Sequence, residues 1–326
     1  GGYIVHYFPL SLSQQNILNL ERAFPGTSIN NISTTVHING RLDYLLLQES
    51  IHRILENDDS LRTQLTTVDG ELVQYHVPYD RIDFPVYDFC STNSESIANW
   101  EIAVTREPLP LENSPLYRFF LFKDGENHGG VLVKLHHIIA DGWSQISICN
   151  KIGRTYLELL TGKEVSRTPA PDYELHVLEE QRYLASKAFT RDELYWKKML
   201  ETSGEPSVLK SVTSAAISPV GRRMSFELPQ LLNHAIYSYC MKKRVAPFAV
   251  FYMALAIYFK RIGGADRFTI GVPIFNRANH EFRQSTGMFV TTLPFFNEIN
   301  DTWNLNQFND ALMESWYEML RHQRYP

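Results

Sequence analysis

Segments with the pattern of β-strands and segments with the pattern of α-helices alternate along the first half of this chain. Residues 32–39 are rich in β-branched side chains, which are typical of strands. Residues 42–56 follow, with apolar positions that recur at the period of a helix. Asp69-Gly70 lies between two short apolar runs and predicts a hairpin of 61–67 with 72–77. Two more strands and a helix complete the series, at 116–123, 131–137 and 144–160. This alternation predicts an α/β fold with mixed sheets.

The second half of the chain continues the pattern after a linker. Residues 166–172 contain two prolines and predict that linker, and a charged helical stretch follows at 173–201. Polar, irregular sequence at 202–220 precedes a further set of elements: a strand at 223–228, a helix from residue 230, an apolar helix at 247–262, and strands at 267–274 and 288–295. We therefore expect two α/β lobes, an N-terminal lobe at 1–172 and a C-terminal lobe at 173–326.

The composition of the chain excludes several classes of protein. The 326 residues carry a formal net charge of −5, which argues against a nucleic-acid surface because such surfaces need a basic excess. Cys90, Cys149 and Cys240 are far apart, so a reducing compartment fits better than a disulfide framework. The most apolar run, residues 248–259, is shorter than the ~20 residues that cross a bilayer. We expect a soluble cytoplasmic protein without nucleic-acid or membrane partners.

The motif HHIIADG, residues 136–142, lies where a predicted strand gives way to a predicted helix. A histidine can exchange a proton near neutral pH, and a nearby carboxylate can orient it. A glycine lets a ligand approach the backbone closely. Because neighbouring residues of a strand point to opposite faces, we expect His137 to face a pocket and His136 to support it from behind.

Simpler explanations exist for the same residues. Asp141 could cap the following helix, and both histidines could be ordinary core residues. Metal binding by the pair is disfavoured because adjacent strand histidines point apart and no second His/Asp cluster completes a shell, so we expect no metal. Ser144 is not in a Gly-x-Ser-x-Gly elbow, which disfavours a serine nucleophile. General acid–base or positioning chemistry by His137 is the interpretation that remains.

The motif resembles HHxxxDG, the signature of the condensation domains of nonribosomal peptide synthetases. The shorter HxxxD core is shared with acyltransferases of the chloramphenicol acetyltransferase superfamily. Further segments resemble other motifs of the condensation domains and occur in the same order, at 9–15, 59–63, 173–196, 271–277, 286–293 and 322–326. The resemblance covers essentially the whole chain.

The resemblance implies a fold and a reaction. The fold would be two chloramphenicol-acetyltransferase-like lobes that meet in a V, with a tunnel between them. Donor and acceptor peptidyl carrier proteins would deliver their substrates to opposite mouths, each on a 4′-phosphopantetheine arm. The acceptor amine would attack the donor thioester, and an amide would form. The domain itself would bind no cofactor, and its partners would be the carrier proteins and neighbouring synthetase domains.

The resemblance also assigns roles to residues around the motif. His137 would be the functional histidine at the tunnel centre, with His136 in support. Asp141 would pair with Arg62 and hold the turn that aims His137, and Gly142 would present its backbone N–H to the developing oxyanion. Four further residues are expected to line the tunnel and bind substrate: Trp143, Ser144, Thr291 and Thr292.

Some features depart from the pattern of the family. Thr291 stands where asparagine is usual, and Arg324 replaces an acidic residue. The chain ends at Pro326, before the last motif of the family, so we expect an incomplete second lobe. Two other functions stay open. One is an epimerization domain of the same superfamily, which the order Trp143-Ser144 disfavours, and the other is a non-catalytic module that binds carrier proteins.

Overall fold

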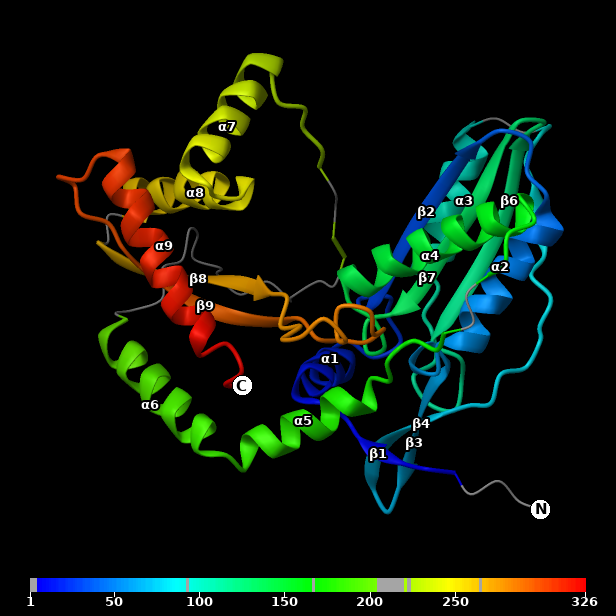
Figure 1. The fold of residues 1–326 in the computed structure, drawn as a ribbon, viewed down its shortest axis with the longest axis horizontal. Coiled ribbons are helices and arrows are strands. Elements are labelled where there is room, and N and C mark those ends of the chain that lie inside the picture. Colours follow the sequence, from blue (N-terminus) through cyan, green and yellow to red (C-terminus); the bar gives the residue numbers. More distant parts are fainter. Residues whose placement is uncertain (1–4, 92–93, 166–167, 204–219, 222–223, 264–265) are drawn as a thin grey trace. The chain divides into compact units, whose positions relative to one another are not determined.

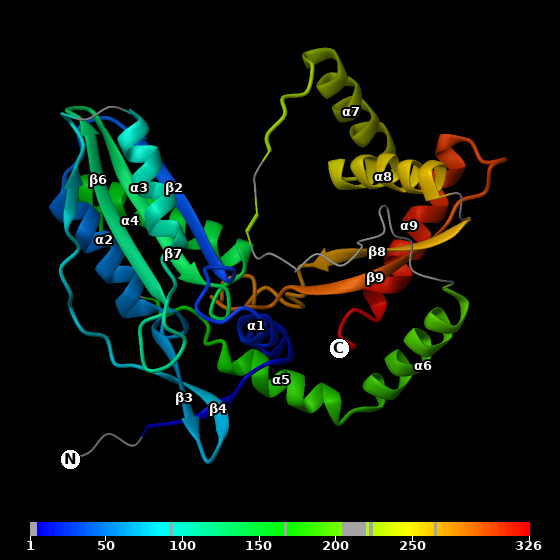
Figure 2. The same ribbon diagram turned by 180° about the vertical axis from the view of Figure 1, so that it is seen from behind.

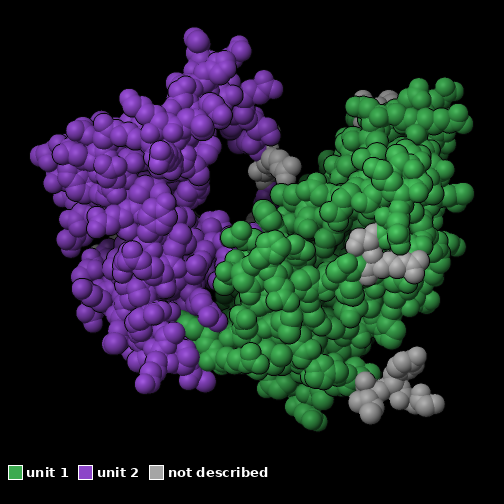
Figure 3. All heavy atoms as spheres, viewed as in Figure 1, with its two compact units in different colours: residues 1–184, 277–290 green, residues 185–276, 291–326 purple. Residues whose placement is uncertain are grey.

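The described residues form two compact units (Figures 1 and 3). The first unit contains residues 1–184 and 277–290, and the second contains 185–276 and 291–326. This division differs from the expected lobes because 173–184 stay with the first unit and 277–290 return to it. The computed structural model describes residues 5–91, 94–165, 168–203, 220–221, 224–263 and 266–326.

A mixed four-stranded sheet lies at the centre of the first unit, with strand order β2-β7-β6-β5. β2 (Asn31–Asn39), β7 (His128–His136) and β6 (Tyr117–Gly125) pair antiparallel, and β5 (Val86–Asp88) pairs with β6 in parallel. The three long strands confirm those predicted at 32–39, 131–137 and 116–123. The fourth, β5, was not predicted, since three residues are too few to show a period.

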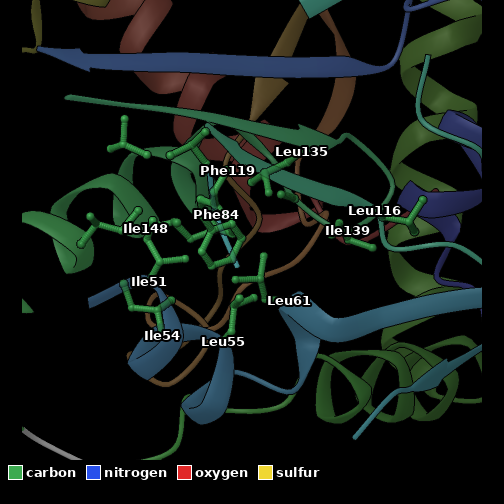
Figure 4. Packing of buried hydrophobic residues seen from close by; sticks show 14 of the residues in the cluster. Ile51, Ile54, Leu55, Leu61, Phe84, Leu116, Phe119, Leu135, Ile139 and Ile148 are labelled. Atoms are coloured by element: carbon green, nitrogen blue, oxygen red, sulfur yellow. The ribbon is translucent and has the colours of Figure 1, made fainter. Parts of the chain in front are cut away.

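Helices cover both faces of this sheet (Figures 1 and 2). α2 (Tyr44–Asn57) and α4 (Gly142–Leu160) pack on one face, where their apolar stripes meet alternate residues of β6 and β7 in one buried cluster (Figure 4). α3 (Ser94–Arg106) covers the other face, where the ring of Trp100 contacts Phe120 and Phe122. Because both faces are covered, β7 is buried along nearly its whole length.

A smaller sheet in the same unit has strand order β1-β4-β3. β3 (Thr63–Val68) and β4 (Glu71–His76) form the predicted hairpin, and β1 (Phe8–Pro9) pairs with β4. Asp69 and Gly70 have φ angles of 51° and 85°, as a two-residue hairpin turn requires. α1 (Leu12–Ala23) follows β1 and begins with a capping box formed by Ser11 and Gln14.

The second unit is built on one antiparallel pair, β8 (Arg267–Ile274) and β9 (Thr291–Glu298). Its buried cluster joins these strands to aromatic and aliphatic residues of the surrounding helices, among them Trp196, Tyr252 and Phe308. The helices are α6 (Lys187–Thr202), α7 (Gln230–Lys243), α8 (Pro247–Gly263) and α9 (Leu305–Arg321). Among the described helices, none alone has the length and apolarity to cross a membrane. α7 and α8 reach that length and apolarity only when they are taken together, and the chain bends by 108° between them.

Several elements differ from the sequence-based expectations. The helical stretch at 173–201 is interrupted between α5 (Glu174–Leu184) and α6, because Ser186 caps a new helix. Residues 224–228 form no strand, and residue 223 lies outside the described residues, as do 166–167 of the linker and 204–219 of the irregular segment. The strand expected at 288–295 begins at Thr291, because the preceding residues pack in the first unit. α1, α3, α9 and β1 were not predicted.

The segment 277–290 packs closely against the residue that precedes α5. Gly287 lies beside the buried ring of Tyr173, and a Cβ atom at position 287 would overlap that ring. We expect Gly287→Ala to lower the free energy of unfolding by about 1–3 kcal/mol, because the ring or the backbone must move. The matched control is Gly153→Ala in α4, where a Cβ would meet nothing within 4 Å.

The control should be neutral, or stabilising by up to about 1 kcal/mol, because alanine is the better helix former. Urea unfolding followed by circular dichroism measures both changes. Equal unfolding midpoints for Gly287→Ala and the parent would contradict the close packing at Tyr173.

Candidate active site

The HHIIADG motif occupies the junction between β7 and α4. β7 ends at His136, a turn follows, and α4 begins at Gly142. His137 therefore lies in the turn rather than in the strand, so strand alternation does not determine where its side chain points. Its backbone N–H donates to the carbonyl of Asn30 at 2.7 Å, just before β2. This bond fixes the backbone of His137 relative to the central sheet.

The imidazole of His137 forms no hydrogen bond with any residue that the structure describes. The side chain is partly buried, and its Nδ1 atom is buried without a hydrogen-bond partner in the described part of the chain. A histidine whose ring nitrogen bonds a protein group has its tautomer set by that bond. Since no described residue forms a hydrogen bond with either ring nitrogen of His137, the ring is available to donate a hydrogen bond to a substrate or to accept one from it.

His136, in contrast, is enclosed by protein. The backbone N–H of Ile138 donates to its Nδ1 at 3.1 Å, and its Nε2 lies 3.6 Å from a carboxylate oxygen of Glu21 in α1. This contact is the main cause that lowers the pKa of Glu21 below its ordinary value. Asn30 donates to the same carboxylate at 2.7 Å. These contacts support the expected structural role of His136.

Asp141 is fully buried, and both of its carboxylate oxygens accept hydrogen bonds. Oδ1 accepts from Arg277 at 2.7 Å and from the backbone N–H of Ser144 at 2.9 Å. Oδ2 accepts from the backbone N–H of Phe289 at 3.1 Å, and the N–H of Asp141 donates to the carbonyl of Gly287 at 3.1 Å. Asp141 thus caps α4, which is one of the roles expected for it from the sequence, and it also binds the segment 277–290.

Arg277 completes this buried network. Its side chain has 0% exposure, and it donates to the carbonyls of Phe282 and Ser285 at 2.6 and 2.8 Å. The guanidinium carbon lies 3.9 Å from the centre of the Phe289 ring. Burial lowers the pKa of Arg277, and the charge of Asp141 opposes that shift. The pair therefore holds the segment 277–290 in place against the start of α4.

The predicted pairing of Asp141 with Arg62 is wrong. Arg62 instead donates to Asp59 at 2.6 Å, to the carbonyl of Val77 at 2.9 Å, and to carbonyls at the end of α2. The last carbonyls of a helix lack partners within the helix, so Arg62 stabilises that terminus. The motif spacing could not reveal Arg277 as the partner, since 136 residues separate it from Asp141.

Two of the residues expected to line the tunnel have different environments. Ser144 is fully buried, and its hydroxyl donates to the carbonyl of Gly287 at 3.0 Å and accepts from Arg277 at 2.8 Å. This packing contradicts the expected substrate contact of Ser144, since its hydroxyl already forms hydrogen bonds with Gly287 and Arg277. Trp143 is 44% exposed, and its indole N–H donates to the carbonyl of Arg283 at 2.8 Å.

Gly142 lies in the first turn of α4 and is exposed. A Cβ at this position would meet nothing within 4 Å, so the fold itself does not require a glycine here. The N-terminus of a helix presents backbone N–H groups and a partial positive charge. An oxyanion role for Gly142 stays a prediction that this position suits.

Thr291 and Thr292 belong to the second unit, at the start of β9, opposite Ile274 and Pro273 of β8. Their expected contact with substrate stays a prediction.

Sequence reasoning missed the roles of two further residues. Gln14 is buried, and its side-chain amide donates to the carbonyl of Ile138 at 2.9 Å, inside the histidine turn. The hydroxyl of Tyr173 donates to the carbonyl of Met288 at 2.5 Å and lies 2.7 Å from that of Ser11. Burial raises the pKa of Tyr173, so its hydroxyl keeps its proton. Both residues lie in segments that resemble motifs of the family, and that resemblance is the signal that could have found them.

Several proteins resemble this chain in sequence. A model described as condensation domain matches residues 5–326. Surfactin synthase subunit 1 of Bacillus subtilis (strain 168) is 33% identical over 327 residues, which are 99% of this chain and 9% of that protein. Tyrocidine synthase 2 of Brevibacillus parabrevis is 26% identical over 333 residues, which are 98% of this chain and 9% of that protein. The chain thus spans a small fraction of the length of these relatives.

Solved structures resemble the chain in fold. The first condensation domain of the calcium-dependent antibiotic synthetase, in complex with substrate analogue 3a, matches with a TM-score of 0.87 at 21% identity, over 100% of this chain and 76% of that one. The starter condensation domain of rhizomide synthetase matches with a TM-score of 0.79 at 22% identity, over 98% of this chain and 74% of that one. These matches confirm the expected α/β fold with mixed sheets.

The buried pair makes a quantitative prediction for a double-mutant cycle. Asp141→Asn and Arg277→Gln should each lower the free energy of unfolding by about 3–5 kcal/mol, because each leaves its partner buried and unpaired. The double variant should lose less than the sum, by about 1–3 kcal/mol. Urea unfolding measures all four proteins.

Arg62→Gln supplies the control cycle, since Arg62 does not touch Asp141. Its effect should add to that of Asp141→Asn within about 0.5 kcal/mol. A larger coupling with Arg62 than with Arg277 would contradict the network described above.

Proposed function

The chain belongs to the condensation-domain family of nonribosomal peptide synthetases, and from that premise we propose that it forms an amide bond between two carrier-bound substrates. The donor is an acyl or peptidyl thioester, and the acceptor is an aminoacyl thioester. The observation that carries this proposal is the imidazole of His137, which forms no hydrogen bond with any described residue. It lies in a turn that a buried ion pair and several backbone hydrogen bonds hold in place.

The proposed reaction joins the acceptor nitrogen to the donor carbonyl carbon. The α-amino group attacks the thioester, the carbon–sulfur bond breaks, and the donor arm leaves as a thiol. One proton passes from the nitrogen to the sulfur. Because an α-amino group has an unperturbed pKa of about 7.7–8.0, a substantial share is already deprotonated near neutral pH and a strong base is not needed. An imidazole that orients the amine and accepts its proton meets this demand.

The start of α4 suits the second requirement of the reaction, which is stabilisation of the oxyanion. Negative charge develops on the carbonyl oxygen as the amine attacks, and backbone N–H groups at a helix N-terminus stabilise such charge. Gly142 lies five residues after His137 and has open space at its Cα. We propose that the thioester approaches the backbone of Gly142 closely and that the exposed ring of Trp143 forms a neighbouring surface.

The partners in this proposal are donor and acceptor peptidyl carrier proteins and the neighbouring synthetase domains, in the cytoplasm. The 4′-phosphopantetheine arms belong to the carriers, so the domain needs no cofactor of its own. The family assignment supports these partners, and the acidic net charge of −5 is consistent with protein partners rather than nucleic acid.

The test is amide formation with loaded donor and acceptor carrier proteins, followed by mass spectrometry. We expect His137→Ala to lower the rate by about 10²–10⁴-fold, because positioning and proton transfer are both lost. Unfolding midpoints should stay close to that of the parent, since the ring bonds no described residue. His234→Ala, at an exposed position of α7, is the matched control and should keep the parent rate.

Other outcomes would replace this assignment. Product formation by His137→Ala at the parent rate would show that His137 does not act in the reaction. Exchange of the α-hydrogen of the loaded substrate with deuterated water, without amide formation, would indicate an epimerization domain. Carrier binding without either reaction in the parent chain would indicate a non-catalytic carrier-binding module.

A further inference from the structure

Two imidazoles and a carboxylate come together at the end of the central sheet that is remote from His137. His37 lies near the end of β2, Asp124 near the end of β6, and His128 at the start of β7. Each offers one ligand atom, and these atoms all lie within 4.8 Å of one another. β7 runs from His128 to His136, so its whole length separates this cluster from the histidine turn.

The strand register brings the two histidines to the same face of the sheet. Asn39 lies opposite His128, and His37 lies opposite Gly130, so His37 and His128 are diagonal neighbours across β2 and β7. Their rings stack with centroids 5.4 Å apart and an interplanar angle of 17°. A Cβ at Gly130 would overlap the carbonyl of Val36, which shows how closely the two backbones approach there.

A local irregularity of the hairpin adds the carboxylate. The register of β6 and β7 shifts between Lys123 and Gly125, and Asp124 lies in this bulge. The carboxylate of Asp124 forms a hydrogen bond with Nδ1 of His128. Bulges redirect side chains away from the regular alternation of a strand, and here the redirected group is a metal-ligand type.

A second carboxylate lies beside the cluster. Glu101 of α3 has an oxygen 3.7 Å from Nε2 of His37, and that oxygen is buried without a hydrogen-bond partner among the described residues. A buried, unpartnered carboxylate oxygen costs free energy unless a cation or a donor compensates it. Carboxylates next to metal-binding histidines orient the ring and increase the affinity for the metal. Glu101 therefore gives the cluster the negative charge that a divalent cation requires.

We propose that His37, Asp124 and His128 bind a divalent transition-metal ion of the Zn²⁺ type, with Glu101 in support. Two imidazoles and one carboxylate suit Zn²⁺, Co²⁺ or Ni²⁺ better than Mg²⁺ or Ca²⁺, which prefer sites made only of oxygen. The ion joins β2, β6 and β7 at one point. Because it binds the folded chain and not the separated strands, it stabilises the sheet without taking part in the reaction at His137.

The experiment titrates the chelator-treated full chain with Zn²⁺ by calorimetry, and with Co²⁺ by visible absorption. We expect one saturable site per chain and a rise in melting temperature when Zn²⁺ is added. His37→Gln and Asp124→Asn should each weaken binding at least about tenfold and remove the rise in melting temperature. Glu101→Gln should weaken binding by about 10- to 100-fold, because it removes a supporting carboxylate.

Two exposed residues supply matched controls, His234→Gln in α7 and Glu126→Gln in the turn before β7. Both should bind as the parent does. Far-ultraviolet circular dichroism confirms that each variant is folded before titration. The absence of saturable binding in the parent would overturn the proposal, as would parent-like affinity in the double variant His37→Gln/Asp124→Asn, which would place the ion elsewhere on the chain.

Discussion

The buried ion pair between Asp141 and Arg277 is the interaction on which the arrangement of the histidine turn, the start of α4 and the segment 277–290 depends. Both side chains have 0% exposure, so their desolvation must be offset by good geometry and by further hydrogen bonds. Those bonds are present: Asp141 caps α4 and holds the N–H of Phe289, while Arg277 holds carbonyls of its own loop. One pair thereby connects the histidine turn, the start of α4 and a segment that lies far along the chain.

This network divides the polar residues around the turn into two groups. His136 and Ser144 are committed to protein contacts, and Gln14 binds the turn from α1. His137 is the exception, because no described residue bonds its ring. The turn is thus fixed by hydrogen bonds, while the imidazole of His137 bonds no described residue. Positioning and proton transfer require this arrangement, because the catalytic group must keep its hydrogen bonds for the substrate.

The sequence predicted features that depend on nearby residues and missed those that depend on distant ones. The strands and helices around the motif were predicted from periodicity, and the Asp69-Gly70 hairpin was predicted from turn chemistry. Arg62 was assigned to the wrong carboxylate because its true partners are Asp59 and the end of α2, whereas Arg277 reaches Asp141 only through the return of 277–290 to the first unit. His37, Asp124 and His128 are brought together by register and a bulge, neither of which a sequence pattern displays.

Hydrogen exchange measured by mass spectrometry on Asp141→Asn tests the central role of the pair most directly. An amide has one acceptor atom, so asparagine cannot replace both carboxylate oxygens. We expect exchange to become at least about tenfold faster in the peptides that contain Ser144 and Phe289, while the β3–β4 hairpin keeps its protection. Unchanged protection at Ser144 and Phe289, in a variant that exchanges like the parent throughout, would contradict the claim that this ion pair holds the histidine turn.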